Sequence, residues 1–378
     1  MSRTGFQRAF QFWISRPILK LSASFVPKVH EWFWPVRRNA NRLLVRIAAA
    51  AALATTGQSA LLASANEGLN DLCSPTSVLY EIDHNNRPRL EKILDDASRV
   101  ANGEAVLWRV EKPGTPASFL FGTLHVINDS LQEISAATRA AIDQSKIVAV
   151  ESAETSRSAY SDAMAQAAPL MVSMDKELQN ILAEDEITVV EKAITNAGYA
   201  PQLALALKPW VAIMFLADSA CQKKLQERGS KSMDALVVDR ATANGLPVVG
   251  LETMLEQYRS LAMISQKVQV AWLKASIELY PRVDDVSLTM AELYRFRRLD
   301  AVWPLTQELA PAAGLDDATL SSLRFELVGK RNLRMLESAL PLFESGGAFV
   351  AIGAMHQTGS DGLVALLRQR GFTVTAIE

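Results

Sequence analysis

The chain has 378 residues, a length that allows one large domain or two smaller ones. Hydrophobic residues make up 49% and charged residues 21% of it, so a disordered, a collagen-like and a disulfide-framework chain are all excluded. The net charge of −2 is unevenly spread: residues 1–46 hold nine Lys or Arg and one acid, Glu31, and the acidic remainder argues against nucleic-acid binding.

The first 65 residues have the pattern of an export signal. A basic region is followed by an apolar stretch at residues 47–54, and residues 63–65 (Ala-Ser-Ala) form a small-x-small cleavage site just beyond it. This pattern predicts export to the periplasm or the extracellular space, with cleavage after Ala65. Three alternatives stay open: an uncleaved membrane anchor, an organelle transit peptide, and a start codon assigned too early. We expect a basic leader plus signal peptide at residues 1–65, membrane contact only through this leader, and a single domain at residues 66–378.

Cys73 and Cys221 are the only two cysteines of the chain. Two thiols are too few for a four-thiolate zinc site. In an oxidising compartment they can form a disulfide, whereas the alternative is two unpaired buried thiols. Both outcomes are compatible with the sequence.

Beyond the leader, short apolar runs alternate with helical patterns. Residues 112–114 (Lys-Pro-Gly) separate the first two runs and predict a hairpin. The expected strands are residues 105–111, 117–122, 146–151, 247–252, 348–353 and 372–377. The expected helices are residues 88–100, 129–144 with Asp129 as cap, 232–244 and 360–371, and residues 158–226 and 253–345 are mostly helical. The alternation predicts an α/β fold: a central mixed sheet flanked by helices, with a long helical insertion.

Two of the three histidines beyond the leader share one local pattern. His125 and His356 each follow an apolar strand and a Gly-x-x-His loop that begins at Gly122 or Gly353, and a helix comes next. In a parallel sheet this pattern places an imidazole just past the carboxyl end of a strand, where α/β sheets bind ligands. Two such histidines on separate strands can converge on one ion.

Glu151 is the third candidate, because it ends the apolar run at residues 147–150. A carboxylate at this position is costly unless something pairs with it. A cation bound by His125, His356 and Glu151 would satisfy all three side chains. Two imidazoles, one carboxylate and an open position make a hydrolytic metal site, in which the ion acidifies a bound water and polarises a carbonyl.

Each candidate also has a purely structural alternative. A single Gly-x-x-His is more often structural, and Glu151 can be a strand-end surface residue or pair with an arginine. Glu252 also ends a strand and is a candidate ligand, a support for a ligand or an N-cap. Asp234 is expected to be a first-turn helix charge. Arg331 is a candidate clamp for a substrate carboxylate or oxyanion, or a residue of a solvated helix face, and His84 is expected in a loop.

Short segments, in a fixed order along the chain, resemble the TraB/GumN family, which includes the Tiki-type metalloproteases. They are residues 107–110, 119–125, 148–151, 233–236, 247–253, 331–332, 349–363 and 370–374. The resemblance implies an α/β fold related to the erythromycin-esterase-like proteins. The two Gly-x-x-His motifs of the family fall on His125 and His356, and its acidic residue falls on Glu151.

The resemblance also implies an activity without fixing the substrate. Tiki members are metal-dependent proteases that prefer manganese or cobalt, whereas other members are linked to conjugation-pheromone shutdown or to polysaccharide gene clusters. We expect an exported hydrolase that cleaves a peptide or small secreted substrate, with a divalent cofactor (Mn, Co or Zn) bound by His125, Glu151 and His356. Glu151, Arg331 and Glu252 are the expected catalytic residues. The competing hypotheses are a non-catalytic protein that sequesters a peptide signal, and a metal-independent esterase-like hydrolase with a histidine base.

Overall fold

The computed structural model describes residues 73–152, 154 and 157–378. The predicted leader at residues 1–65 lies outside the described residues, so the export signal and the domain boundary at residue 66 stay predictions. Within the described part of the chain, no helix is both long enough and apolar enough to cross a membrane.

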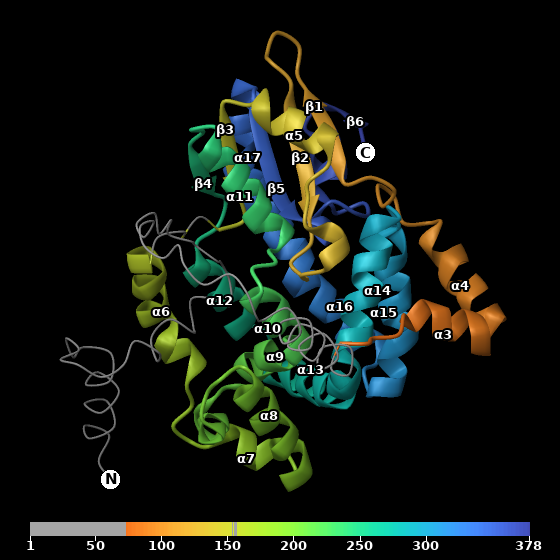
Figure 1. Ribbon diagram of the computed structural model, residues 1–378, viewed down its shortest axis with the longest axis vertical. Helices are drawn as coiled ribbons and strands as arrows, with labels where there is room; N and C mark the ends of the chain where they lie inside the picture. Colours follow the sequence, from red (N-terminus) through yellow and green to blue (C-terminus); the bar gives the residue numbers. More distant parts are fainter. Residues whose placement is uncertain (1–72, 153, 155–156) are drawn as a thin grey trace, which may run out of the picture. The chain divides into compact units, whose positions relative to one another are not determined.

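The described residues contain one six-stranded mixed sheet, which confirms the predicted fold class (Figure 1). The strands are β1 (Leu107–Glu111), β2 (Ser118–Thr123), β3 (Ile147–Val150), β4 (Val248–Gly250), β5 (Ala348–Gly353) and β6 (Thr373–Ala376). Their order across the sheet is β4-β3-β5-β2-β1-β6. Strands β4, β3, β5 and β2 run parallel, whereas β1 is antiparallel to both β2 and β6.

The central strands β2 and β5 are buried, and most of their residues are apolar. All six residues of β2 and of β5 are buried, as is typical of strands covered on both faces. The predicted hairpin of β1 and β2 is confirmed: Leu107 pairs with Phe121 and Val110 with Ser118. Its turn contains Gly114 at φ 83°, a left-handed conformation that glycine adopts without steric cost.

Helices fill the connections between the strands. Before the sheet lie α3 (Val78–Asn85) and α4 (Arg87–Ala97), and between β2 and β3 lie η2 (Asp129–Leu131) and α5 (Ala136–Asp143). Between β3 and β4 lie α6 (Arg157–Met171), α7 (Glu177–Ile181), α8 (Glu184–Asn196), η3 (Pro201–Ala206), α9 (Pro209–Ala217), α10 (Ala220–Glu227) and α11 (Met233–Ala243).

The second long connection, between β4 and β5, completes the helical insertion. It holds α12 (Met254–Ala262), α13 (Gln266–Leu279), η4 (Tyr280–Arg282), α14 (Val283–Arg295), η5 (Leu299–Ala301), α15 (Val302–Leu309), η6 (Ala310–Ala313), α16 (Asp317–Arg324), the π-helical turn η7 (Phe325–Gly329) and α17 (Lys330–Ser345). After β5 come η8 (Ala354–His356) and α18 (Leu363–Gln369).

The structure corrects three predictions about helices. His84 lies in the last turn of α3 and not in a loop. Asp129 begins a short 3-10 turn, whereas α5 starts only at Ala136, because the Ser135 hydroxyl accepts the Thr138 N–H and so caps the helix there. The final helix starts at Leu363 and not at residue 360.

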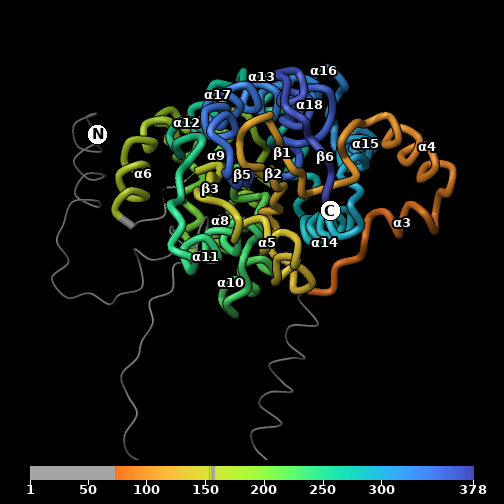
Figure 2. Tube along the Cα trace, turned by 90° about the horizontal axis from the view of Figure 1, so that it is seen from above, coloured from red at the N-terminus to blue at the C-terminus, as the bar shows by residue number. Residues whose placement is uncertain are grey.

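The main core lies between the sheet and the helices α17 and α18. Figure 2 shows α17 and α18 on one face of the sheet, with α5 and α11 on the other. Helix α17 buries Met335, Leu336, Ala339 and Phe343, whose spacing makes one apolar stripe. This packing fixes the direction of α17, whose first turn carries Arg331.

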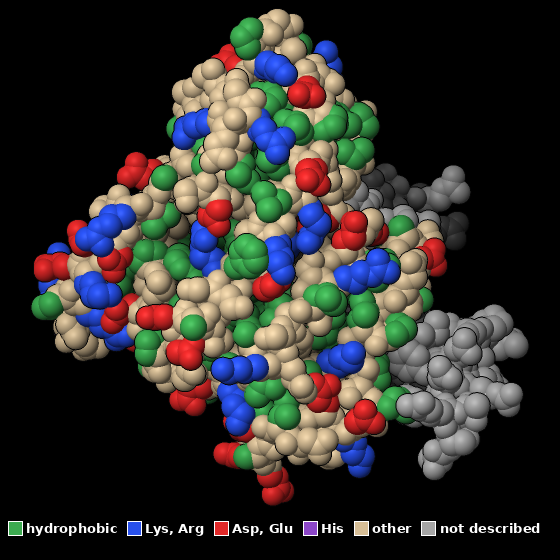
Figure 3. Space-filling model, turned by 180° about the vertical axis from the view of Figure 1, so that it is seen from behind, with side chains coloured by type: hydrophobic (Ala, Val, Ile, Leu, Met, Phe, Trp, Pro, Cys, Tyr) green, Lys and Arg blue, Asp and Glu red, His purple; other side chains and the backbone are tan. Residues whose placement is uncertain are grey.

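Charges of both signs are mixed on the surface. On the face that Figure 3 shows, Lys and Arg side chains alternate with Asp and Glu side chains, and none of the described segments there carries a large area of one sign. Such a surface offers no long electropositive track to a polyphosphate.

Cys73 and Cys221 form a disulfide, which decides between the two alternatives that the sequence left open. The bond joins the beginning of the described chain to α10 in the helical insertion.

Asp218, at the end of α9, gives a testable pH dependence. Burial raises the pKa of this carboxyl from its ordinary value of 3.8 to about 6. The protonated form therefore favours the folded state, and this contribution is complete below about pH 4 and lost as the pH rises through 6. We expect Asp218→Asn to raise the melting temperature at pH 7.5 by about 2–4 °C and to change it little at pH 4. Thermal unfolding of both proteins at the two pH values checks this, and an equal difference at both would contradict it.

Candidate active site

Four predicted site residues follow the ends of the parallel strands. His125 comes after β2, Glu151 after β3, Glu252 after β4 and His356 after β5. Because β4, β3, β5 and β2 are neighbours and parallel, their carboxyl ends lie at one edge of the sheet. From the outer strand inward, the order along this edge is Glu252, Glu151, His356 and His125.

Gly353 is the point at which three of these side chains meet. A methyl group added there would lie 3.0 Å from Oε1 of Glu151, 3.3 Å from Nε2 of His125 and 3.5 Å from Cδ2 of His356. The backbone N–H of Gly353 also donates to Glu151 Oε1 at 2.6 Å. The structure thus brings both imidazoles and the carboxylate together, and only glycine leaves the space between them open.

His125 is oriented by Asp234. Nδ1 of His125 lies 2.7 Å from Oδ2 of Asp234, whose Oδ1 accepts a hydrogen bond from the Thr123 hydroxyl at 2.6 Å. Nδ1 therefore donates, and Nε2 faces the space beside Gly353. The negative charge of Asp234 raises the pKa of His125 to about 9. With 66% of its side chain exposed, His125 is the most accessible member of the group.

His356 is oriented by Asn332 in the same way. The Asn332 amide nitrogen donates to the carbonyl of Asp361 at 2.7 Å, so its oxygen faces Nδ1 of His356 at 2.6 Å. An amide oxygen only accepts, and Nδ1 must therefore carry the proton, which leaves the lone pair on Nε2. Burial lowers the pKa of His356 to about 4, so the ring is neutral at pH 7.

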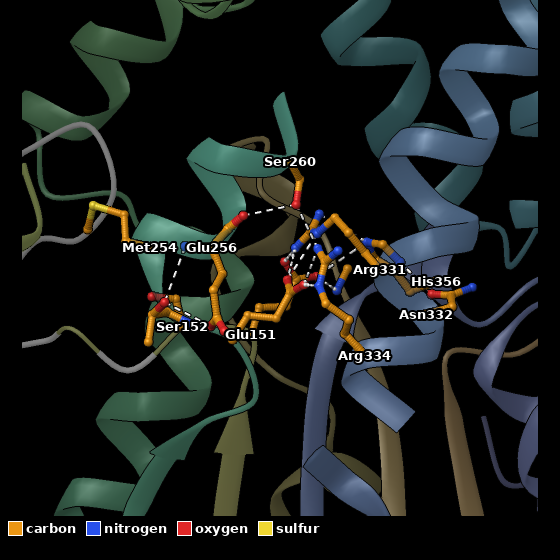
Figure 4. Close-up of polar contacts among 12 residues, drawn as sticks. Glu151, Ser152, Met254, Glu256, Ser260, Arg331, Asn332, Arg334 and His356 are labelled. Atoms are coloured by element: carbon orange, nitrogen blue, oxygen red, sulfur yellow. Dashed lines mark hydrogen bonds and ion pairs between the residues drawn. The ribbon is translucent and has the colours of Figure 1, made fainter. Parts of the chain in front are cut away.

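Arg331 links the two carboxylates of the site (Figure 4). Its Nη2 donates to Oε2 of Glu151 at 2.7 Å and to Oε2 of Glu252 at 2.8 Å. Burial favours the protonated form of Glu151, but Arg331 and the two imidazoles outweigh this effect and hold its pKa well below the usual range. Arg331 is 17% exposed, so it does not belong to a solvated helix face.

Glu252 holds Arg331 and Arg334 at once. The Glu252 side chain is 2% exposed, and its Oε1 accepts from Nη2 of Arg334 at 2.9 Å. Arg334 also donates to the hydroxyl of Ser260 on α12 at 2.7 Å, and Figure 4 shows both arginines reaching from α17 toward α12. The N-cap of α12 is Thr253, so Glu252 is not a cap.

The donor set fits a divalent metal ion in its chemistry. Nε2 of His125 faces the space beside Gly353, Nε2 of His356 lies 3.8 Å from Oε1 of Glu151, and an oxygen acceptor fixes each Nδ1, as is usual for metal-binding histidines. Because the pKa of His125 is raised to about 9, its Nε2 would give up a proton when an ion binds. Among the described residues, however, no three His, Cys, Asp or Glu side chains are arranged so that they could hold a metal ion without moving. Nη1 of Arg331 lies 3.3 Å from Nε2 of His356, so Arg331 is the cation that borders this space.

Two of the supporting residues, Asp234 and Asn332, have roles that the sequence did not predict. Asp234 lies in the first turn of α11, as predicted, but its bond to His125 joins residues 109 positions apart. Asn332 and His356 are 24 positions apart. The available signal was that both lie in segments that resemble the family, residues 233–236 and 331–332.

The fold and this sheet edge define an α/β protein with paired Gly-x-x-His loops and a buried carboxylate between them. The family model of the TraB/PrgY/gumN family matches residues 106–376, so the chain belongs to this family. No curated protein and no solved structure matches the chain significantly.

Proposed function

We propose that the protein is an exported metal-dependent hydrolase that cleaves peptide bonds. His125, Glu151 and His356 would hold the metal. The observation that carries this proposal is the pair of imidazoles, each fixed at Nδ1 by an oxygen acceptor. Nε2 of His125 faces the space beside Gly353, and Nε2 of His356 lies 3.8 Å from Oε1 of Glu151. A divalent ion bound there would acidify a water and polarise the scissile carbonyl.

The chain's own side chains have separate tasks in this proposal. His125 lies at the open side of the site, so the substrate would approach past its ring. Arg331 keeps its positive charge beside the reacting carbonyl and would stabilise the oxyanion. Glu252 holds the guanidinium in place through Nε at 3.0 Å and Nη2 at 2.8 Å. Preorganised donors of this kind lose little free energy to reorganisation during the reaction.

Export is supported by two observations. The leader has the basic, apolar and small-residue pattern of a signal sequence, and the disulfide between Cys73 and Cys221 is of a kind found mainly in oxidising compartments. The peptide substrate is supported by the resemblance to the Tiki-type metalloproteases. A peptide or a small secreted molecule can reach an exported enzyme.

A metal-independent hydrolase is the second candidate, because Asp234 and His125 form a carboxylate–imidazole pair at 2.7 Å. In this alternative Nε2 of His125 is the general base once it has lost its proton, which the pKa of about 9 places at alkaline pH, and Arg331 remains the cation of the site. The pair resembles the base of an esterase in its geometry, and it needs no ion to work.

One experiment separates these candidates. The mature protein is treated with a chelator, dialysed, and assayed on a peptide library and on simple esters, with and without Mn²⁺, Co²⁺ or Zn²⁺. We expect peptide cleavage that disappears on chelation and returns with one of these ions, together with about one bound metal per chain by elemental analysis. Cleavage that survives exhaustive chelation would overturn the metal-dependent proposal in favour of the histidine base.

A further inference from the structure

The loop that follows His125 is held by the segment that starts at Cys221. Oε1 of Gln222 accepts the backbone N–H of Ile127 at 2.8 Å, and Nε2 of Gln222 donates to the carbonyl of Ile127 at 2.9 Å. One side chain thus satisfies both backbone groups of a residue two positions beyond His125. We refer to residues 221–231 as the α10 arm.

The other end of the α10 arm holds the same loop. The backbone N–H of Lys231 donates to Oε1 of Gln132 at 2.8 Å, and Nε2 of Gln132 donates to the carbonyl of Lys231 at 3.1 Å. The Ser230 hydroxyl donates to Asp129 at 3.2 Å. Just after the arm, α11 supplies Asp234, which binds His125 itself. The α10 arm is therefore hydrogen-bonded to the loop that follows His125 at Ile127, Asp129 and Gln132.

The disulfide fixes the beginning of this arm. Cys221 is the residue next to Gln222, and the Cα atoms of Cys73 and Cys221 are 5.5 Å apart, within the usual range for a bridged pair. The first turn of α14 aligns both partners: Asp284 accepts from the Ser219 hydroxyl, and Asp285 accepts the backbone N–H of Thr76 at 2.8 Å. Reduction would remove the covalent anchor beside Gln222 and would leave the hydrogen bonds of Ser219 and Thr76 to α14.

We propose that the Cys73–Cys221 disulfide, acting through Gln222, is a redox-controlled positioning device for His125. The site reaches full activity only after the bond has closed. Gln222 is a positioning residue, since it touches the loop and not the substrate. This inference rests on the proposed function for its effect on catalysis, but its effect on the loop does not depend on any activity.

The chemistry of the device is a thiol–disulfide exchange. Closing the bond removes two electrons and two protons from the thiols of Cys73 and Cys221, and a disulfide oxidant such as oxidised glutathione accepts them and leaves as two thiols. A cytoplasmic chain would keep both thiols reduced, because that compartment is reducing. An exported chain would acquire the bond and with it the fixed loop, so hydrolysis in the producing cell would be suppressed.

The test measures loop and activity together in the full mature chain. Hydrogen exchange of the Ile127 amide is followed before and after reduction with a phosphine, which is oxidised to its phosphine oxide, and after reoxidation with oxidised glutathione. We expect the exchange rate of this amide to rise at least about tenfold on reduction, kcat to fall about 10- to 100-fold with a smaller change in KM, and both to return on reoxidation. The double variant Cys73→Ala/Cys221→Ala should behave as the reduced protein does.

Two variants separate a positioning role of Gln222 from a general loss of stability in α10. Gln222→Leu keeps the disulfide and should reproduce the fast exchange and low kcat, now without any response to the reductant. Gln226→Leu, on the same helix, is the matched control and should resemble the wild type. An Ile127 amide whose exchange is unchanged in the reduced protein would overturn the proposal, even if exchange rises in Gln222→Leu. If exchange rises but the oxidised protein cleaves neither peptides nor esters, the link between disulfide and loop stands and the proposed function fails.

Discussion

Replacing His125 and His356 together by alanine should abolish hydrolysis, with kcat/KM reduced by at least about 10³-fold. Removal of an essential catalytic group has effects of this size in other hydrolases. The two imidazoles approach one point beside Gly353, so the double variant removes two of the three proposed ligands at once. Elemental analysis of the same preparations should show that bound metal is lost together with activity. Peptide cleavage by wild type and variant is compared at saturating Mn²⁺, Co²⁺ or Zn²⁺.

The matched control for this experiment is His84→Ala. His84 lies in α3, where its ring stacks on Tyr80 with centroids 6.3 Å apart, and it takes no part in the site. It should keep full activity and metal content. Equal activity of wild type and the double variant would remove the enzymatic interpretation altogether.

Glu151→Gln distinguishes an enzyme from a protein that only sequesters a peptide. The amide keeps the shape of the side chain but loses the charge that the proposed metal and Arg331 share. A hydrolase should lose activity with this change, whereas a sequestering protein should keep its peptide affinity, as measured by calorimetry. Retained peptide binding with no cleavage by the wild type would favour the binding protein.

Much of the fold follows from short local patterns. The apolar runs at residues 147–150 and 348–353 predicted buried strands because parallel strands covered on both faces tolerate few polar residues. The Lys-Pro-Gly turn predicted the hairpin of β1 and β2. The two Gly-x-x-His patterns located His125 and His356 at strand ends, and parallel pairing of β2 with β5 places those ends side by side. Each of these predictions depends on a hydrophobic pattern or a turn motif that lies within about ten residues of sequence.

The partners of the site residues did not follow from the sequence. Arg331 and Glu151 are separated by 180 positions and Arg331 and Glu252 by 79, and no local period relates them. The direction of Arg331 depends on the π-helical turn η7 directly before α17, which shifts the following side chains around the helix. The predicted start of the helix at Asp129 was wrong for a local reason. Asn128, Asp129 and Ser135 are all good N-cap residue types, and the sequence does not show which of them caps the helix.

Arg331→Met should destabilise the protein by about 3–5 kcal/mol, the cost of removing one partner of a buried ion pair. Two carboxylates depend on this guanidinium: the side chain of Glu151 is 10% exposed and that of Glu252 is 2% exposed. Methionine keeps most of the volume and the apolar stem, so the change measures the charge and its hydrogen bonds and not a cavity. Urea unfolding of wild type and variant at pH 7 gives the difference.

The pH dependence of this loss follows from Glu151. In the wild type its pKa is depressed below its ordinary value of 4.5, so its contribution to stability is present above pH 4.5 and is lost as the pH falls toward the pKa of the folded state. Without Arg331 this contribution disappears, and the carboxyl can fold in its protonated form. The destabilisation by Arg331→Met should therefore be largest at pH 7 and shrink as the pH falls below about 4.5.

Arg334→Met is the matched control, because Arg334 lies one turn further along α17 and shares Glu252 but is 40% exposed. Solvent screens such a pair, so we expect a loss of only about 0–1 kcal/mol. In the double variant Arg331→Met/Glu151→Gln, the uncompensated carboxylate is gone, and part of the lost stability should return. If the Arg331→Met protein is as stable as Arg334→Met, the two buried carboxylates do not need the Arg331 guanidinium. Arg331 would then contribute to substrate binding and not to stability.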